Sequence, residues 1–174
     1  MQDIRNLCKR LGLTSGQYTP RRSAILAFHR MPSRYMHSAL VRVTMRGKST
    51  EDPYIRDDIE GSLGEQAEQT IRWLKANLNI ISQNIGSGRR TDRYEIPEPA
   101  LRELIVNALL HRNYNARESI QVEITPHQVT ITNPGRLDSE IEQVEPAFLY
   151  QHSHPQNPPL LHVLAAQQWA EGRG

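Results

Sequence analysis

Three polar side chains that could carry chemistry recur every four residues along one predicted helix. They are Glu103, Asn107 and His111, which fall on one narrow stripe at about 100° per residue. A glutamate can hold a water as general base, an asparagine can give its oxygen to Mg²⁺, and His111 or the next residue, Arg112, can face phosphate. The stripe suits a polar ligand that carries a metal ion and negative charge. The spacing fits equally well a surface helix with one exposed polar seam.

The residues around this stripe are mostly apolar and predict a helix over about 99–112. Leucine, isoleucine, valine and alanine occupy most of its circumference: Leu101, Leu104, Ile105, Val106, Ala108, Leu109 and Leu110. A helix that is apolar on most sides is typically buried. A polar stripe inside such a surround is unfavourable to bury unless a partner satisfies it, so a buried stripe would need a ligand.

The elements that must position this helix follow from alternation and turn residues. Residues 120–124 and 129–132 alternate apolar and polar side chains and predict a β-hairpin, which runs into the turn Asn133-Pro134-Gly135. Upstream, the pattern predicts helices over 4–11, 21–29 and 57–77, a strand over 39–45, and two strands over 80–85 and 89–96. Downstream, it predicts a helix over 160–169.

Length and composition limit the classes of protein to which the chain can belong. The 174 residues correspond to about one domain, and Lys plus Arg (21) nearly balance Asp plus Glu (19), which does not by itself indicate a nucleic-acid-binding protein. The single cysteine, Cys8, excludes an internal disulfide and favours a cytoplasmic location. No apolar run is long enough to span a membrane.

The segment from the stripe helix to the turn resembles the nucleotide-binding core of the GHKL ATPases. Their helical N-box has the form Glu-x-x-x-Asn, which here is Glu103-Leu-Ile-Val-Asn107. A closer resemblance, carried by ALRELIVNALLHRNY, IQVEITPHQVTITNPGRL and HPQNPPLLHVL, is to the C-terminal ATPase-like domain of a bacterial and archaeal family. Its members are labelled transcriptional regulators, divergent AAA proteins or RecG-related ATP-dependent DNA helicases, and the resemblance covers nearly the whole chain.

This resemblance implies a role for each matching residue, with ATP and Mg²⁺ as cofactors. Glu103 would polarise the attacking water, and Asn107 would coordinate Mg²⁺ that bridges the phosphates. His111 and Arg112 would lie near the phosphate end. At the adenine end, Asn133 takes the place of the aspartate that accepts the adenine amino group. Gly135 would permit close approach of the backbone to the nucleotide.

Departures from the GHKL pattern support a second hypothesis. The adenine turn of these enzymes is Asp-x-Gly-x-Gly, whereas this chain has Asn133-Pro134-Gly135, with one glycine and no carboxylate. No further glycine occurs before Gly172, and the Walker A pattern of P-loop motors is absent, which argues against helicase activity. The alternative is a degenerate nucleotide-fold module that does not bind ATP and acts in oligomerisation or DNA-linked scaffolding.

We therefore expect an α/β fold, an α+β two-layer sandwich in which a mixed sheet packs on helices, with a GHKL-like core. Residues 1–55 would continue from an upstream domain, and residues 56–174 would form the ATP-binding core, in one unit with the preceding segment. The expected function is a regulatory ATP/Mg²⁺-binding module of a DNA-associated protein, with possible weak hydrolysis. Its partners would be a nucleotide, DNA contacted through other domains, and possibly a second copy, but no membrane.

Overall fold

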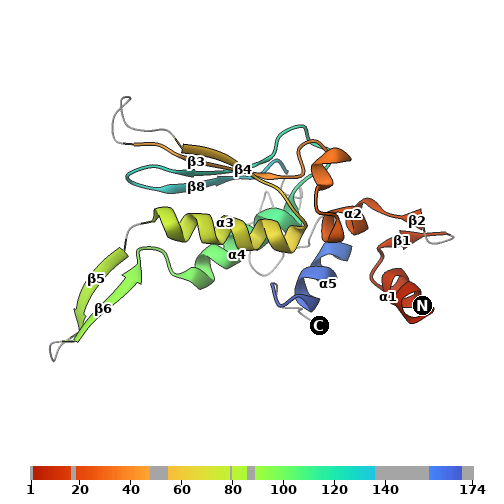
Figure 1. Cartoon of the computed structure of the whole chain (residues 1–174), viewed down its shortest axis with the longest axis horizontal. Coiled ribbons are helices and arrows are strands. Elements are labelled where there is room, and N and C mark those ends of the chain that lie inside the picture. The colour runs from red at the N-terminus through yellow and green to blue at the C-terminus, as the bar shows by residue number, and fades with distance from the viewer. Residues whose placement is uncertain are drawn as a thin grey trace, which may run out of the picture.

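A four-stranded mixed sheet and two long helices form the centre of the molecule (Figure 1). The structure, a computed structural model, describes residues 2–16, 19–47, 55–78, 80–85, 89–135 and 157–169. In chain order the elements are α1 (Gln2–Arg10), β1 (Thr14–Ser15), β2 (Thr19–Pro20), α2 (Arg22–Phe28), a 3₁₀ turn (Pro32–Arg34), β3 (Val41–Met45), β4 (Ile55–Ile59), α3 (Leu63–Asn77), β5 (Ile80–Ile85), β6 (Arg89–Tyr94), α4 (Glu98–His111), β7 (Ile120–Ile124), β8 (Val129–Thr132) and α5 (Pro158–Ala166).

The central sheet has the strand order β4-β3-β7-β8. Strands β3 and β7 are parallel, with Val41 opposite Ile120, whereas β4 and β8 add antiparallel strands at the two edges. Figure 1 shows α3 and α4 on one side of this sheet. The fold is therefore the expected α+β two-layer sandwich with a mixed sheet.

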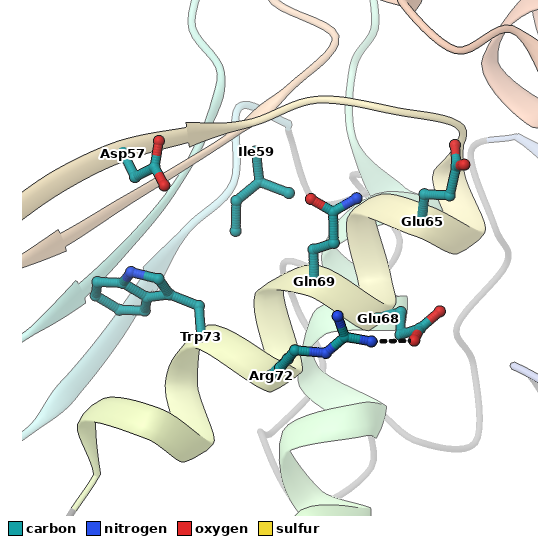
Figure 2. Close-up of a pocket in the computed structure, with 7 residues that line it drawn as sticks. All are labelled: Asp57, Ile59, Glu65, Glu68, Gln69, Arg72 and Trp73. Carbon is teal, nitrogen blue, oxygen red and sulfur yellow. Dashed lines mark hydrogen bonds and ion pairs between the residues drawn. The ribbon is translucent and has the colours of Figure 1, made fainter.

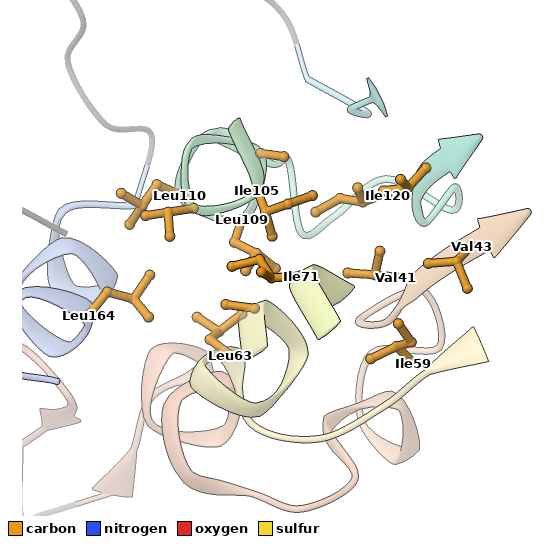
Figure 3. Close-up of a cluster of buried hydrophobic side chains, with 14 of the residues drawn as sticks. Val41, Val43, Ile59, Leu63, Ile71, Ile105, Leu109, Leu110, Ile120 and Leu164 are labelled. Atoms are coloured by element: carbon orange, nitrogen blue, oxygen red, sulfur yellow. The ribbon is translucent and has the colours of Figure 1, made fainter. Parts of the chain in front are cut away.

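The hydrophobic core lies between α3, α4 and the facing side of the sheet (Figure 3). Each strand contributes alternate residues, so β3 supplies Val41 and Val43 and β7 supplies Ile120 and Val122, all at most 1% exposed. Leu63, Leu74, Leu101 and Leu109 close the core from the helices and have no exposed surface. The apolar side chains at alternate strand positions and those at three-to-four spacing on the helices pack in one layer, as expected for this architecture.

Helix α4 is buried on most sides, as its sequence predicts. The six side chains that it buries are Leu101, Ile105, Val106, Ala108, Leu109 and Leu110. Leu104, which the helical wheel placed on the apolar side, is instead 50% exposed. It directly follows Glu103 in the chain, so the exposed side of α4 is wider than the three-residue stripe.

Helix α3 is shorter than the predicted range of 57–77, because its first residues form the edge strand β4 instead. The helix begins after Ser62, where the Ser62 side chain and Glu65 form a capping box with the backbone. Gly61 precedes this cap with a φ of +128°, which L-residues rarely adopt. Ile59 satisfies both a helical and a strand pattern, and pairing with Val41 decides in favour of the strand.

The capping box makes the stability of α3 depend on pH. Hydrogen bonds from the Ser62 backbone and then from its hydroxyl hold the pKa of Glu65 below its ordinary value. A lowered folded-state pKa stabilises the protein above the unfolded-state pKa, and this stabilisation is lost as pH falls through the folded-state value. We expect the urea unfolding free energy of Glu65→Gln to fall less between pH 6 and pH 3 than that of the wild type. Parallel pH profiles would contradict this.

The N-terminal elements pack with the C-terminal helix into a second, small cluster. Leu13 and Ala27 are each 1% exposed and lie with Val163 of α5, which is 3% exposed. The first 55 residues also supply β3, which lies between β4 and β7 in the sheet. The expected boundary between residues 55 and 56 therefore falls inside β4, which pairs with β3.

Strands β5 and β6 form the predicted antiparallel hairpin, which projects beyond the ends of α3 and α4 in Figure 1. The helices expected at both chain ends and the hairpin of β7 and β8 also form close to their predicted ranges. In the part of the chain that the structure describes, no helix has the length and apolarity needed to cross a membrane.

Candidate functional site

The polar stripe of α4 is accessible and internally hydrogen-bonded. Glu103 is exposed, and Asn107 is half-buried one turn further on. The Asn107 Nδ2 donates to Glu103 Oε1 at 2.9 Å, so the amide nitrogen is directed toward the carboxylate. This fixes the orientation of the Asn107 amide and leaves its oxygen as the group that could act as a metal ligand.

His111 ends the stripe in a different environment. Its side chain is half-buried, and burial lowers its pKa below the ordinary value. A lowered pKa favours neutral imidazole at pH 7. His111 can therefore contribute a hydrogen bond near the end of α4, but a neutral ring supplies no positive charge to a phosphate.

Arg112 lies in the interior, away from the exposed stripe. It is 1% exposed, its Nη2 donates to the Glu118 carbonyl at 2.8 Å, and its guanidinium lies 4.9 Å from the centre of the Tyr114 ring. Its Nε and Nη1 are buried without a hydrogen-bond partner in the described structure. The expected phosphate-facing residue is thus a buried cation with two unused nitrogen donors.

Asn133 and Gly135 meet the C-terminal end of α4. The Asn133 Nδ2 donates to the carbonyl of Ala108, the residue after Asn107, at 3.0 Å, while its Oδ1 is buried and has no hydrogen-bond partner among the described residues. The backbone of Pro134 accepts from the Asn113 N–H at 2.8 Å. A Cβ on Gly135 would lie 3.0 Å from the carbonyl oxygen of His111. The close approach at Gly135 is thus to the helix itself.

Side chains from three separate segments satisfy the last carbonyls of α4. Helix ends leave their final carbonyl groups without intrahelical partners, and α4 ends without a glycine cap. Asn133 bonds the Ala108 carbonyl, the Tyr114 hydroxyl bonds that of Leu109 at 2.9 Å, and Asn157 bonds that of Leu110 at 2.9 Å. Asn157 also donates to the Arg112 carbonyl at 2.9 Å.

Tyr114 and Asn157 are the residues of this region whose role sequence reasoning missed. Burial raises the pKa of Tyr114, which therefore remains a protonated donor. The usual signal for a helix C-terminus is a nearby glycine, and here the donors come from further along the chain. Asn157 directly precedes two prolines at the start of α5, a position that resembles an ordinary N-cap.

A hollow of about 470 Å³ lies elsewhere, between β4 and α3 (Figure 2). Its described lining contains none of the residues predicted for the nucleotide site. It presents the carboxylates Asp57, Glu65 and Glu68 and one guanidinium, Arg72, which bonds Glu68 at 2.6 Å. Three carboxylates make this hollow unsuitable for a triphosphate.

The donor chemistry of the α4 region fits Mg²⁺ only in part. Asn107 offers an oxygen, which Mg²⁺ accepts, but no group of three or more acidic, histidine or cysteine side chains suited to a metal occurs among the described residues. Magnesium commonly takes one or two protein ligands and completes its shell with phosphate oxygens and water. The region therefore fits a metal that arrives with a nucleotide.

Comparison with known proteins supports the fold class. Neither a family model nor a curated protein matches the sequence. A solved structure that is similar is the crystal structure of the DIP2311 protein from Corynebacterium diphtheriae, at a TM-score of 0.74 and 17% sequence identity. The match covers 97% of this chain and 33% of that protein. This chain thus spans about a third of its structural neighbour, and the likeness shows a shared fold.

Proposed function

We propose that the chain is an ATP/Mg²⁺-binding regulatory module, with weak ATPase activity, of a DNA-associated regulatory or RecG-related protein. The observation that carries the proposal is that buried polar atoms near the end of α4 lack hydrogen-bond partners in the described structure. Among the described residues, four buried side-chain atoms have no hydrogen-bond partner: Thr70 Oγ1 on α3, and Arg112 Nε, Arg112 Nη1 and Asn133 Oδ1, whose residues adjoin the end of α4. Buried polar groups are nearly always paired, so the three atoms near the end of α4 support a ligand there.

The chemistry of these atoms matches the two ends of a nucleotide. The Asn133 oxygen is an acceptor whose orientation is fixed, because the other end of the amide is bound to Ala108. It could accept from an exocyclic amino group such as that of adenine. The Arg112 nitrogens are donors that suit an anionic oxygen. Asn107 lies one residue from the Asn133 contact and would hold Mg²⁺, and Glu103 would hold the attacking water.

Calorimetric titration with Mg²⁺ and a non-hydrolysable ATP analogue tests the proposal. We expect the wild type to bind, and Asn107→Ala to weaken binding at least tenfold, because a metal ligand is lost. Glu103→Gln keeps an acceptor for the Asn107 amide and should bind normally while losing turnover of ATP. Gln69→Ala, an exposed amide on α3, is the matched control and should bind as the wild type does. No binding at millimolar nucleotide would overturn the proposal.

A second candidate is a nucleotide-fold module without ATP binding that acts in oligomerisation or DNA-linked scaffolding. The observation in its favour is that predicted site residues already make structural contacts. Asn133 bonds a carbonyl at the end of α4, Gly135 packs against the His111 carbonyl, and the Arg112 guanidinium lies over the Tyr114 ring. Under this candidate, the wild type releases no binding heat in the calorimetric titration at millimolar nucleotide. Analytical ultracentrifugation then shows a dimer or a larger oligomer.

A further inference from the structure

The face of the sheet opposite the helices carries three arginines around one threonine. Thr44 is the fourth residue of β3, with Arg42 two residues before it and Arg46, just after the strand, two residues beyond it. Across the antiparallel pair its register partner is Arg56, and across the parallel pair it is Glu123. Because residues at alternate positions of a strand share a face, and register partners lie side by side, these five side chains occupy one patch.

Two of the three guanidinium groups are held in place by carboxylates. Arg42 Nε and Nη2 bond the two oxygens of Asp58 at 2.7 and 2.8 Å, and Arg46 bonds Glu123. The bond from Arg42 holds the pKa of Asp58 below its ordinary value. The Arg56 side chain makes no hydrogen bond or ion pair within the described ranges, although its charge also helps to lower the pKa of Asp58. Among these five described side chains, three guanidinium groups lie with two carboxylates, and this excess of positive charge suits an anionic phosphate group.

These side chains surround a hollow of about 330 Å³. Thr44 is 9% exposed, so the short threonine lies at the bottom while the longer arginines line the sides. The Arg42 and Arg46 side chains are 31% and 62% exposed, which leaves their guanidinium groups within reach of a ligand. The polar lining continues onto the neighbouring strands through Gln121 and Thr130.

We propose that this hollow, the Thr44 hollow, binds a phosphate group, supplied by a nucleic-acid backbone or by a small phosphorylated molecule. Planar guanidinium groups suit the tetrahedral oxygens of phosphate, and a fixed arginine loses little entropy on binding. The described lining contains no aromatic ring on which a base could stack. Recognition here would therefore depend on the phosphate group and not on the base.

The test pairs two variants of equal charge change. Arg46→Gln/Arg56→Gln removes two arginines of the hollow, and Arg21→Gln/Arg34→Gln removes two exposed arginines elsewhere. Binding of a fluorescent single-stranded oligonucleotide, a duplex of the same length and inorganic pyrophosphate is measured at several salt concentrations. We expect the first variant to bind at least tenfold more weakly than the second. With a nucleic acid, the plot of log affinity against log salt should also become less steep by about 0.7–0.9, as for the loss of one phosphate contact.

A third variant, Thr44→Val, keeps the shape of the side chain and removes its hydroxyl, and should weaken binding about threefold to tenfold while the protein stays folded. Tighter binding of either oligonucleotide than of pyrophosphate identifies a nucleic-acid backbone, and the reverse identifies a small phosphorylated molecule. Equal losses in the two double variants, or no binding of any of the three probes by the wild type, would overturn the proposal. Asn107→Ala, which tests the nucleotide site, should leave binding of the two oligonucleotides unchanged, so the two proposals fail separately.

Discussion

Replacing Leu109 by alanine is expected to lower the free energy of unfolding by about 2–5 kcal/mol. Leu109 has no exposed surface and lies in the layer between α4 and α3 (Figure 3). Truncation removes buried methyl groups and leaves a cavity that close-packed neighbours fill only partly. Urea denaturation, with the midpoint and slope both fitted, measures the change.

The matched control for this prediction is on the same helix. Leu104→Ala makes the same chemical change at a side chain that is 50% exposed, so its effect should stay within about 0.5 kcal/mol. The two variants have equal helix propensity at the substituted position, and their difference isolates burial. Equal destabilisation would show that α4 does not pack as described.

Replacing Asn157 by alanine is expected to destabilise the protein by about 1–3 kcal/mol, because two carbonyl groups lose their donor. The Asn157 amide bonds the carbonyls of Leu110 and Arg112, each at 2.9 Å. The Asn157 side chain makes no capping hydrogen bond within its own helix, α5. The substitution therefore removes hydrogen bonds at the end of α4 and none within α5. Thermal and urea unfolding both report it.

A variant of the same size separates the effect of losing the hydrogen bonds from the effect of losing side-chain volume. Asn157→Asp keeps the size of the side chain, but an ionised carboxylate cannot donate and faces two carbonyl oxygens. We expect it to be at least as unstable as Asn157→Ala at pH 7 and to recover part of its stability below pH 4, where the carboxyl is protonated. Wild-type stability of Asn157→Asp at pH 7 would refute the bridging role.

The elements that carry a strong period were predictable from the sequence. The alternation in β7 predicts a strand with one buried face, and the apolar residues of α4 predict a helix buried on most sides; the structure agrees with both except at the exposed Leu104. Strand β4 was not predicted, because Ile59 lies at helical spacing from Leu63 and only pairing with the distant Val41 favours the strand. Local patterns cannot decide a choice that tertiary pairing makes.

In the candidate site, too, local geometry was predictable and tertiary contacts were not. Glu103 and Asn107 are one turn apart on a single helix, so their proximity follows from local geometry, and their hydrogen bond agrees with it. The burial of Arg112 could not be predicted, because an arginine next to a polar stripe is normally exposed. The surroundings of Arg112 depend on how the chain after α4 folds, which places the Tyr114 ring against the Arg112 guanidinium.

The parallel pair at the centre of the sheet has a consequence for how the chain is made. Strand β3 ends at residue 45 and its parallel partner β7 begins at residue 120, so translation must proceed through the intervening helices before the pair can close. Contacts of such long separation slow folding. Until β7 is synthesised, β3 has a strand partner on its β4 side alone, and a ribosome-stalled chain that stops before residue 120 should stay sensitive to protease.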